Sequence, residues 1–253
     1  QPALMAVSVA VARVLAERAG RPVAELGAFV AGHSLGEYSA LTVVGAFSLA
    51  DAARLLRLRG DAMQRAVPVG VGAMAALLGA ERDAAEAFAA EAAQGEVCTI
   101  ANDNAPGQIV ISGHRGAVER AVAIAAGAGI RRSVLLPVSA PFHCPLMAPA
   151  AQEMAEAVAN IRIEPPLLPV VTNVLATAET DPTVLRRLLV EQITGVVRWR
   201  EGVEYVASQG VGTLVELGAG KVLTGLTRRI DRTLEGLAIG TSAELDAFVA
   251  SLD

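Results

Sequence analysis

The sequence predicts an α/β fold in which a mostly parallel sheet is covered by helices on both faces. Short apolar runs such as 168–173 and 213–217 alternate with segments of helical periodicity such as 3–19 and 182–192. Strands that are apolar throughout are typical of parallel sheets buried on both sides. Hydrophobic residues make up 53% of the chain and charged residues 19%, which is the composition of a globular protein.

The predicted core elements follow from periodicity and from glycine and proline boundaries. In chain order they are a helix over 3–19 that ends at Gly20, a strand over 26–31, helices over 37–44, 49–66 and 145–159, a strand over 168–173, helices over 182–192 and 203–208, and a strand over 213–217.

The segment 72–138 interrupts this alternation with a different order of elements. It is predicted to contain strands over 74–78, 97–100, 109–112 and 133–138, with helices over 82–93 and 116–126. The order βαββαβ is typical of a ferredoxin-like unit. We therefore expect residues 1–71 and 139–253 to form the main core and residues 72–138 to form an inserted ferredoxin-like subdomain.

Charge and cysteine content exclude several classes of protein. The net charge of −5 argues against nucleic-acid binding, which requires a basic face. Cys98 and Cys144 are the only cysteines, too few for a disulfide framework or a metal cluster, so no metal site and a reducing, cytoplasmic location are expected. No apolar run approaches the length of a membrane span. The apolar opening over 2–11 lacks a basic leader and is interpreted as a packed helix.

The most specific motif is Gly32-His33-Ser34-Leu35-Gly36, which has the form G-x-S-x-G. It stands between a predicted strand and a predicted helix, the context required of a nucleophile elbow. The glycines permit a tight turn, and the Leu35 N–H at the helix start would stabilise an oxyanion beside the Ser34 hydroxyl. The alternative is a glycine-rich turn without chemistry.

A serine nucleophile needs a general base, and the chain contains three histidines. His33 lies within the elbow itself, and His114 is interpreted as a surface residue in a turn. His143 follows a predicted strand in a loop stiffened by Pro141 and Pro145, as a positioned base requires. It is therefore the candidate base, although a loop histidine alone is also compatible with a structural role.

Arg59 stands within the apolar face of the helix predicted over 49–66. The residues of that face are Ala52, Leu55, Leu56 and Met63. A buried guanidinium requires an anionic partner and binds a carboxylate through two parallel hydrogen bonds. That carboxylate could belong to a substrate, or to a Glu or Asp in a structural ion pair.

Five segments together resemble the malonyl-CoA:acyl carrier protein transacylases of fatty acid and polyketide synthesis. They are the elbow and its helix (32–41), the histidine loop (140–147), the arginine helix (58–64), and the segments 104–108 and 216–223. The resemblance spans essentially the whole chain. It implies an α/β-hydrolase-like core with a ferredoxin-like insert, transfer of a malonyl group from coenzyme A to acyl carrier protein, and no permanently bound cofactor.

The resemblance also implies roles for individual residues. Ser34 would carry the acyl ester with His143 as its base, and a backbone carbonyl, which by position falls at Gln192, would orient the histidine. Arg59 would bind the malonyl carboxylate, with Met63 beside it. Phe142 would exclude branched acyl groups, unless it only packs within the loop.

The expected partners are malonyl-CoA and acyl carrier protein, with no nucleic acid, no membrane and a monomeric state. Arg131 and Arg132 could dock an acidic carrier protein, or could simply be solvated. Two rival functions remain, a serine hydrolase or thioesterase and an inactive binding domain. The family's glycine-glutamine loop, which supplies a second oxyanion donor, is absent because the sequence starts at Gln1. The resemblance therefore implies an N-terminally truncated member, and one lost donor typically costs ~10²–10³ in turnover.

Overall fold

The computed structural model describes residues 1–252, which form two compact units. Unit 1 comprises residues 1–57, 161–185 and the chain from 202 onward, and unit 2 comprises residues 58–160 and 186–201. Three helices continue from one unit into the other, namely α3 (Leu49–Arg65), α7 (Pro182–Thr194) and α8 (Trp199–Ser208). The mixed α/β fold predicted from the sequence is confirmed.

Unit 1 combines helices with two small sheets. Its other elements are α1 (Pro2–Ala19), a 3-10 turn (Val23–Glu25), β1 (Val30–Ala31), α2 (Leu35–Val43), β6 (Val170–Val171), β7 (Ala178–Glu179), β8 (Thr213–Leu217), α9 (Val222–Ile230), β9 (Glu235–Ile239) and α10 (Ser242–Ala250). β1 pairs with β6 in parallel and β6 with β7 in antiparallel orientation, while β8 and β9 form a separate parallel pair.

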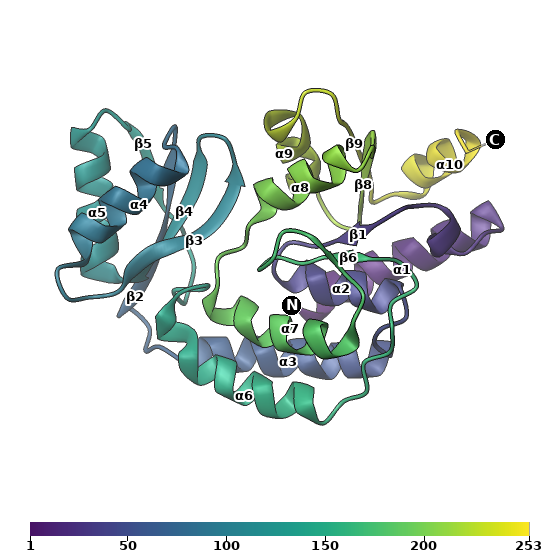
Figure 1. The fold of residues 1–253 in the computed structure, drawn as a ribbon, viewed down its shortest axis with the longest axis horizontal. Helices are drawn as coiled ribbons and strands as arrows, with labels where there is room; N and C mark the ends of the chain where they lie inside the picture. Colours follow the sequence, from purple (N-terminus) through teal and green to yellow (C-terminus); the bar gives the residue numbers. More distant parts are fainter. Residues whose placement is uncertain (253) are drawn as a thin grey trace. The chain divides into compact units, whose positions relative to one another are not determined.

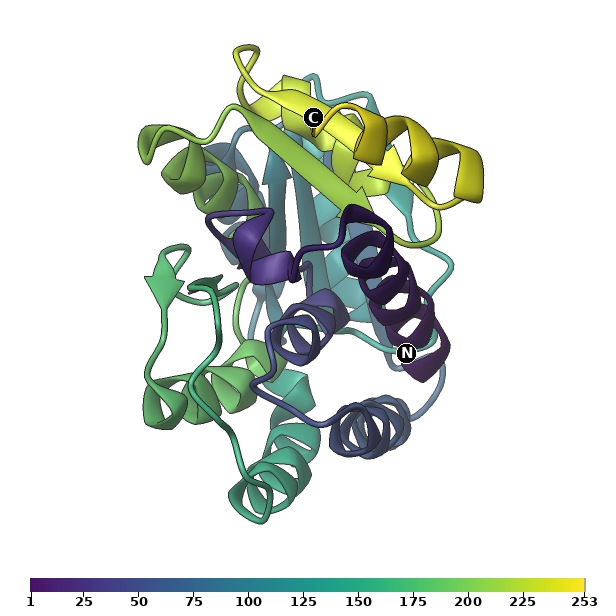
Figure 2. The same cartoon turned by 90° about the vertical axis from the view of Figure 1, so that its right-hand side faces the viewer.

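Both ends of the described chain are anchored within unit 1. α1 buries one stripe of side chains and ends at Gly20, whose φ of 62° is the left-handed conformation that suits glycine at a helix end. Figure 2 shows the yellow helix α10 beside the purple helix α1. An ion pair between Arg18 and Asp246 joins these two helices.

Unit 2 contains an antiparallel sheet with two helices on one face (Figure 1). Its elements are β2 (Gly72–Leu78), α4 (Arg82–Ala93), β3 (Cys98–Ala105), β4 (Gln108–His114), α5 (Arg115–Gly127), β5 (Arg132–Leu135), a 3-10 turn (Pro145–Met147) and α6 (Ala148–Ala159). The strand order is β3-β4-β2-β5. Alternate β2 residues, beginning with Ala73 and Ala75, face a core shared with α4 and α5, while Met74 and Ala76 face the opposite side.

Unit 2 also includes a group of three helices, formed by the second part of α3, by α6 and by most of α7. Arg65 of α3 donates to Glu153 of α6 at 2.6 Å, and Arg186 of α7 donates to the Val158 carbonyl of α6. Unit 2 therefore extends beyond the 72–138 segment on both sides.

Several strands differ from their predicted lengths. Of the segment 26–31 only Val30 and Ala31 form a strand, and of 168–173 only Val170 and Val171. The reason is that β1 and β6 pair with each other at these residues alone. The strand predicted over 133–138 ends at Leu135. β7, α9, β9 and α10 go beyond the sequence prediction. In unit 1 the pairings β1–β6 and β8–β9 are parallel and β6–β7 is antiparallel, but the strands lie in two small sheets and not in the single core sheet expected from the sequence.

No helix within residues 1–252 is both long and apolar enough to cross a membrane. In the same residues, no three His, Cys, Asp or Glu side chains are grouped so that they could hold a metal ion.

Candidate active site

Ser34 has a strained backbone conformation at the turn between β1 and α2. Its φ is 52° and its ψ is −107°, and a non-glycine residue in this region costs about 1–3 kcal/mol that the surrounding structure must offset. Gly32 permits the turn, because a Cβ there would lie 2.0 Å from the carbonyl carbon of Gly36. Leu35 is the first residue of α2, and N–H groups of a first helical turn have no acceptor inside the helix. Such groups can stabilise an anion that develops beside the serine.

Asn173, in the segment after β6, holds this turn through hydrogen bonds from its side chain to the backbone. Its Oδ1 accepts a hydrogen bond from the Ser34 N–H at 2.7 Å, and its Nδ2 donates to the Gly32 carbonyl at 2.7 Å. The Asn173 N–H in turn donates to Glu37 Oε2 at 2.9 Å. Asn173 and Glu37 are 3% and 1% exposed, so these bonds are shielded from competition by water.

His143 contacts the backbone of α7 within unit 2. Its Nδ1 lies 2.8 Å from the Gln192 carbonyl oxygen, and both residues are buried. Because a carbonyl oxygen only accepts, this bond requires hydrogen on Nδ1 and leaves Nε2 of the neutral ring able to take up a proton. His143 also has a positive φ of 57°. The ring is therefore held in the tautomer that a general base needs.

Arg59 contacts the side chain of the same glutamine. Its guanidinium donates to Gln192 Oε1 at 2.9 Å. Only 2% of Arg59 is exposed, and Met63, one turn further along α3, is 1% exposed. Gln192 thus touches two predicted site residues at once, His143 through its main chain and Arg59 through its side chain.

The loop that carries His143 packs closely against the sheet of unit 2. A Cβ at Gly72 would lie 2.3 Å from Cγ of Pro141, so only glycine fits at this point of β2. The thiol of Cys144 donates to the Pro141 carbonyl at 3.1 Å. Phe142 is half-buried and packs against the side of the sheet that carries Met74. These contacts fix the loop on both sides of the histidine.

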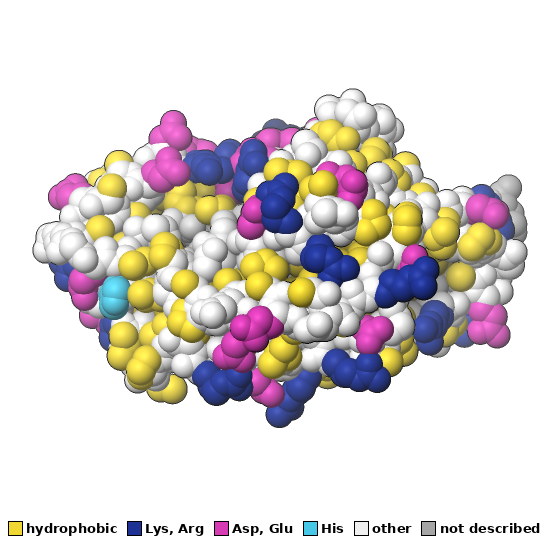
Figure 3. Space-filling model, turned by 60° about the horizontal axis from the view of Figure 1, so that its bottom comes forward, with side chains coloured by type: hydrophobic (Ala, Val, Ile, Leu, Met, Phe, Trp, Pro, Cys, Tyr) yellow, Lys and Arg dark blue, Asp and Glu magenta, His cyan; other side chains and the backbone are white. Residues whose placement is uncertain are grey.

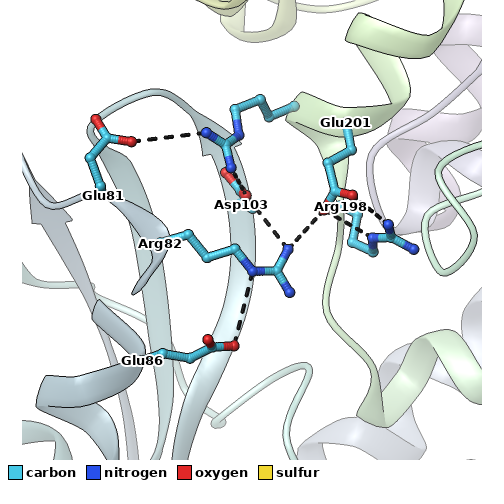
Figure 4. Close-up of polar contacts among 7 residues, drawn as sticks. Glu81, Arg82, Glu86, Asp103, Arg198 and Glu201 are labelled. Atoms are coloured by element: carbon cyan, nitrogen blue, oxygen red, sulfur yellow. Dashed lines mark hydrogen bonds and ion pairs between the residues drawn. The ribbon is translucent and has the colours of Figure 1, made fainter. Parts of the chain in front are cut away.

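Ion pairs fix the segment that follows α7 onto β3 (Figure 4). The fully buried carboxylate of Asp103 accepts from Arg200 at 2.8 Å, and Glu201 accepts from Arg82 at 2.8 Å and from Arg198 at 3.0 Å. Burial raises the pKa of Asp103, and the charges of Arg200 and Arg82 oppose that rise. The hydrogen bond from Arg198 lowers the pKa of Glu201. The cluster keeps this segment attached to the sheet.

Other candidates are less enclosed. Arg131 and Arg132 are exposed at the start of β5, an edge strand. Basic and acidic side chains are interspersed on the face drawn in Figure 3. His114 is half-buried, and its Nδ1 accepts from the Val97 N–H at 2.9 Å. It therefore has a structural contact and is not simply the surface residue that the sequence predicts.

The structure brings His143, Arg59 and Gln192 together within unit 2, whereas Ser34 and Leu35 belong to unit 1. Asn173 was not among the site residues predicted from the sequence. Its only signal was an asparagine at the end of a predicted strand, and such a position indicates nothing about a contact 139 residues away.

Comparisons with known proteins agree on one family. The acyl transferase domain model matches residues 1–244. The malonyl CoA-acyl carrier protein transacylase of Escherichia coli (strain K12) is 48% identical over 253 residues, which is 100% of this chain and 80% of that protein. The crystal structure of acyl-carrier-protein-S-malonyltransferase from Bartonella henselae is 53% identical, with a TM-score of 0.96 over 99% of this chain and 80% of that chain.

A further similar structure contains a carrier protein. It is the PlMCAT:AntF complex, a type II PKS acyl-carrier protein with its malonyl-transacylase. It is 44% identical, with a TM-score of 0.95, and the match covers 99% of this chain and 80% of that chain. The matches extend over both units and their identities are far above the level at which only a fold is shared. The chain belongs to the acyl transferase domain family.

Proposed function

We propose that this protein transfers a malonyl group from coenzyme A to the phosphopantetheine thiol of acyl carrier protein through an acyl-enzyme on Ser34. The observation that carries the proposal is the strained Ser34 conformation at the N-terminus of α2. This geometry suits a serine nucleophile. The names of the relatives supply the acyl group and the acceptor.

In the first half-reaction, Ser34 Oγ attacks the thioester carbonyl carbon and its proton passes to Nε2 of His143. The oxyanion of the tetrahedral intermediate is stabilised by the Leu35 N–H. The intermediate then collapses, the carbon–sulfur bond breaks, and the proton moves from His143 to the sulfur of coenzyme A. The Gln192 carbonyl keeps hydrogen on Nδ1 throughout, so Nε2 is the atom that exchanges the proton.

In the second half-reaction, the phosphopantetheine thiol attacks the carbonyl carbon of the Ser34 ester while His143 accepts the thiol proton. The tetrahedral intermediate collapses, the bond between that carbon and Ser34 Oγ breaks, and His143 returns the proton to Oγ. Arg59 binds the malonyl carboxylate beside Met63, and Phe142 excludes branched acyl groups. These steps are acyl and proton transfers, so their chemistry calls for no resident cofactor.

The same proposal includes the finer architecture and the partners. The strand order β3-β4-β2-β5 and the common face of α4 and α5 support a ferredoxin-like subdomain over 72–138, inserted in an α/β-hydrolase-like core formed by 1–71 and 139–253. The PlMCAT:AntF complex supports a carrier-protein partner, for which Arg131 and Arg132 are the proposed contacts. We propose a cytoplasmic monomer.

Intact-protein mass spectrometry after mixing with malonyl-CoA tests the proposal. We expect a malonyl adduct on the wild-type chain that peptide mapping locates at Ser34. The adduct should be absent from Ser34→Ala and should disappear when holo acyl carrier protein is added. An unmodified wild-type chain would refute the enzymatic proposal and favour the inactive binding domain.

A hydrolase with the same elbow is the rival that shares this adduct. The two activities differ in where the acyl group goes. We expect the Ser34 ester to pass to a phosphopantetheine thiol much faster than to water. An ester that disappears at one rate with and without carrier protein would identify a hydrolase instead.

A further inference from the structure

We propose that Asn173 is a positioning residue for the nucleophile, acting through the backbone of the elbow. Its amide oxygen accepts from the Ser34 N–H, and its amide nitrogen donates to the Gly32 carbonyl, both at 2.7 Å. Asn173 is 3% exposed. Its side chain therefore bonds, in a buried place, to the main chain of the nucleophile and to the residue two positions before it.

The two bonds fix two successive peptide planes. The Gly32 carbonyl belongs to the peptide that precedes His33, and the Ser34 N–H belongs to the peptide that follows it. Fixing both planes determines how the chain enters Ser34, whose φ of 52° is a conformation that serine rarely adopts. A primary amide suits this task because it both donates and accepts hydrogen bonds.

Glu37 fixes Asn173 in turn. The Asn173 N–H donates to Glu37 Oε2 at 2.9 Å, and the Glu37 N–H donates to the Ser34 carbonyl at 3.1 Å. Glu37 lies in the first turn of α2 and is 1% exposed. The elbow, the first turn of α2 and the segment after β6 therefore hold one another in a closed set of hydrogen bonds.

If Ser34 is the nucleophile, as the proposed function requires, this geometry should affect the rate of acylation. The conformation of Ser34 sets the direction of its Oγ and of the Leu35 N–H, which is the proposed oxyanion donor. An error of about 1 Å in either position is enough to slow a reaction by ~10²-fold. Asn173 touches neither substrate nor reacting atoms, so its loss should slow acylation and leave malonyl-CoA binding largely unchanged.

The first test compares Asn173→Leu with Thr172→Val. Leucine has a similar size and makes neither hydrogen bond. Thr172 is the neighbouring residue and is also buried, and its replacement leaves the three bonds of Asn173 in place, so it controls for loss of a buried polar group. We expect burst release of coenzyme A to slow by ~10²-fold in Asn173→Leu alone, with its KM for malonyl-CoA close to that of the control, because the positioning error affects the transition state. Equal burst rates in the two variants would overturn the proposal.

The second test uses Asn173→Asp, which also covers the case in which the leucine variant fails to fold. A protonated carboxyl can donate to the Gly32 carbonyl and accept from the Ser34 N–H, whereas a carboxylate can only accept. Burial and the nearby Glu37 carboxylate should raise the pKa of the introduced group above the ordinary aspartate value. The acylation rate of Asn173→Asp divided by that of the wild type should therefore rise as the pH falls. A ratio independent of pH would overturn the proposal.

The same variants distinguish this proposal from the proposed function. Labelling of Ser34 by an alkyl fluorophosphonate depends on the nucleophile and not on malonyl recognition. A wild-type chain that reacts with the fluorophosphonate but forms no malonyl adduct would refute malonyl transfer. The positioning role of Asn173 would then still be tested by the labelling rates of its variants. Slower labelling in Asn173→Leu than in Thr172→Val supports the positioning role, and equal labelling overturns it.

Discussion

Replacing Arg59 is expected to reduce malonyl transfer selectively. Arg59 is 2% exposed, so a substrate carboxylate that reaches its guanidinium binds away from water. A hydrogen bond to a charged group contributes about 1.5–3 kcal/mol, and each 1.4 kcal/mol is a factor of ten. We therefore expect Arg59→Ala to lose malonyl acylation by roughly 10- to 150-fold.

An acetyl group has no carboxylate, so its transfer should depend much less on Arg59. The informative quantity is the ratio of malonyl to acetyl adduct on Ser34 when both coenzyme A esters compete, measured by intact-protein mass spectrometry. Arg59→Met should give the same change in ratio, since methionine retains much of the apolar stem without the charge. The methionine variant thereby separates loss of the guanidinium from the cavity that alanine leaves.

Arg54→Ala is the matched control on the same helix. Arg54 is 74% exposed and pairs with Asp51 at 2.7 Å, and exposed pairs of this kind contribute about 0–1 kcal/mol. It should leave the malonyl-to-acetyl ratio at the wild-type value. An unchanged ratio in both Arg59 variants would rule out carboxylate binding by Arg59 and leave it a structural role, such as its contact to Gln192.

Three further predictions concern the supports of the site. Arg200→Met should destabilise the protein by about 3–5 kcal/mol because it leaves the buried Asp103 carboxylate with weaker compensation; thermal unfolding should show a smaller loss when Asp103→Leu is added, and an additive loss would contradict this. Gly72→Ala should displace the loop at Pro141 and slow acylation, and a variant with wild-type burst kinetics would argue against that close approach. Burial raises the pKa of Cys98 from 9.0 to about 11, so folding favours the thiol; this stability is fully present below pH 9 and is lost as the pH rises through about 11. Cys98→Ala should remove that part of the decline in denaturant midpoint between pH 9 and 11, and an identical decline in both proteins would refute it.

The helices were largely predictable from the sequence because their signals are local. The predicted helix over 82–93 has the same bounds as α4, and the predicted end at Gly20 is the observed left-handed cap of α1. The strands of unit 1 were harder to predict. An apolar run such as 168–173 shows that a segment is buried, but only a partner strand decides which residues form a ladder, and for β6 only two residues pair with β1.

In the candidate site, too, local patterns could be recognised from the sequence and long-range contacts could not. Ser34, His143 and Arg59 stand in recognisable local patterns, so the sequence alone was enough to propose them as site residues. The contact between Asn173 and Ser34 joins groups 139 residues apart, and a buried asparagine has no local pattern that names its partner. The catalytic roles of Ser34, His143 and Arg59 remain predictions, whereas the hydrogen bonds that hold these residues are seen in the structure.

Gln192 shows how the end of a helix creates part of this site. A carbonyl inside an α-helix accepts a hydrogen bond from the N–H four residues later. The last four carbonyls of a helix have no such N–H partner within it. α7 ends at Thr194, and the Gly195 N–H makes the last bond of the series, to Glu191 at 2.9 Å. The next residues leave the helix because Val197 pairs with β3, donating to the Ala101 carbonyl at 2.9 Å.

The Gln192 carbonyl is available to His143 because α7 ends at Thr194, after which the chain pairs with β3 at Val197. Gln192→Ala would keep this carbonyl and remove only the amide that accepts from Arg59. Side-chain substitution at position 192 thus changes the surroundings of Arg59, whereas the orientation of His143 depends on where α7 stops. Arg200 bonds to Asp103 of β3 at 2.8 Å a few residues after α7 ends, so any effect of this ion pair on His143 would have to pass through the backbone.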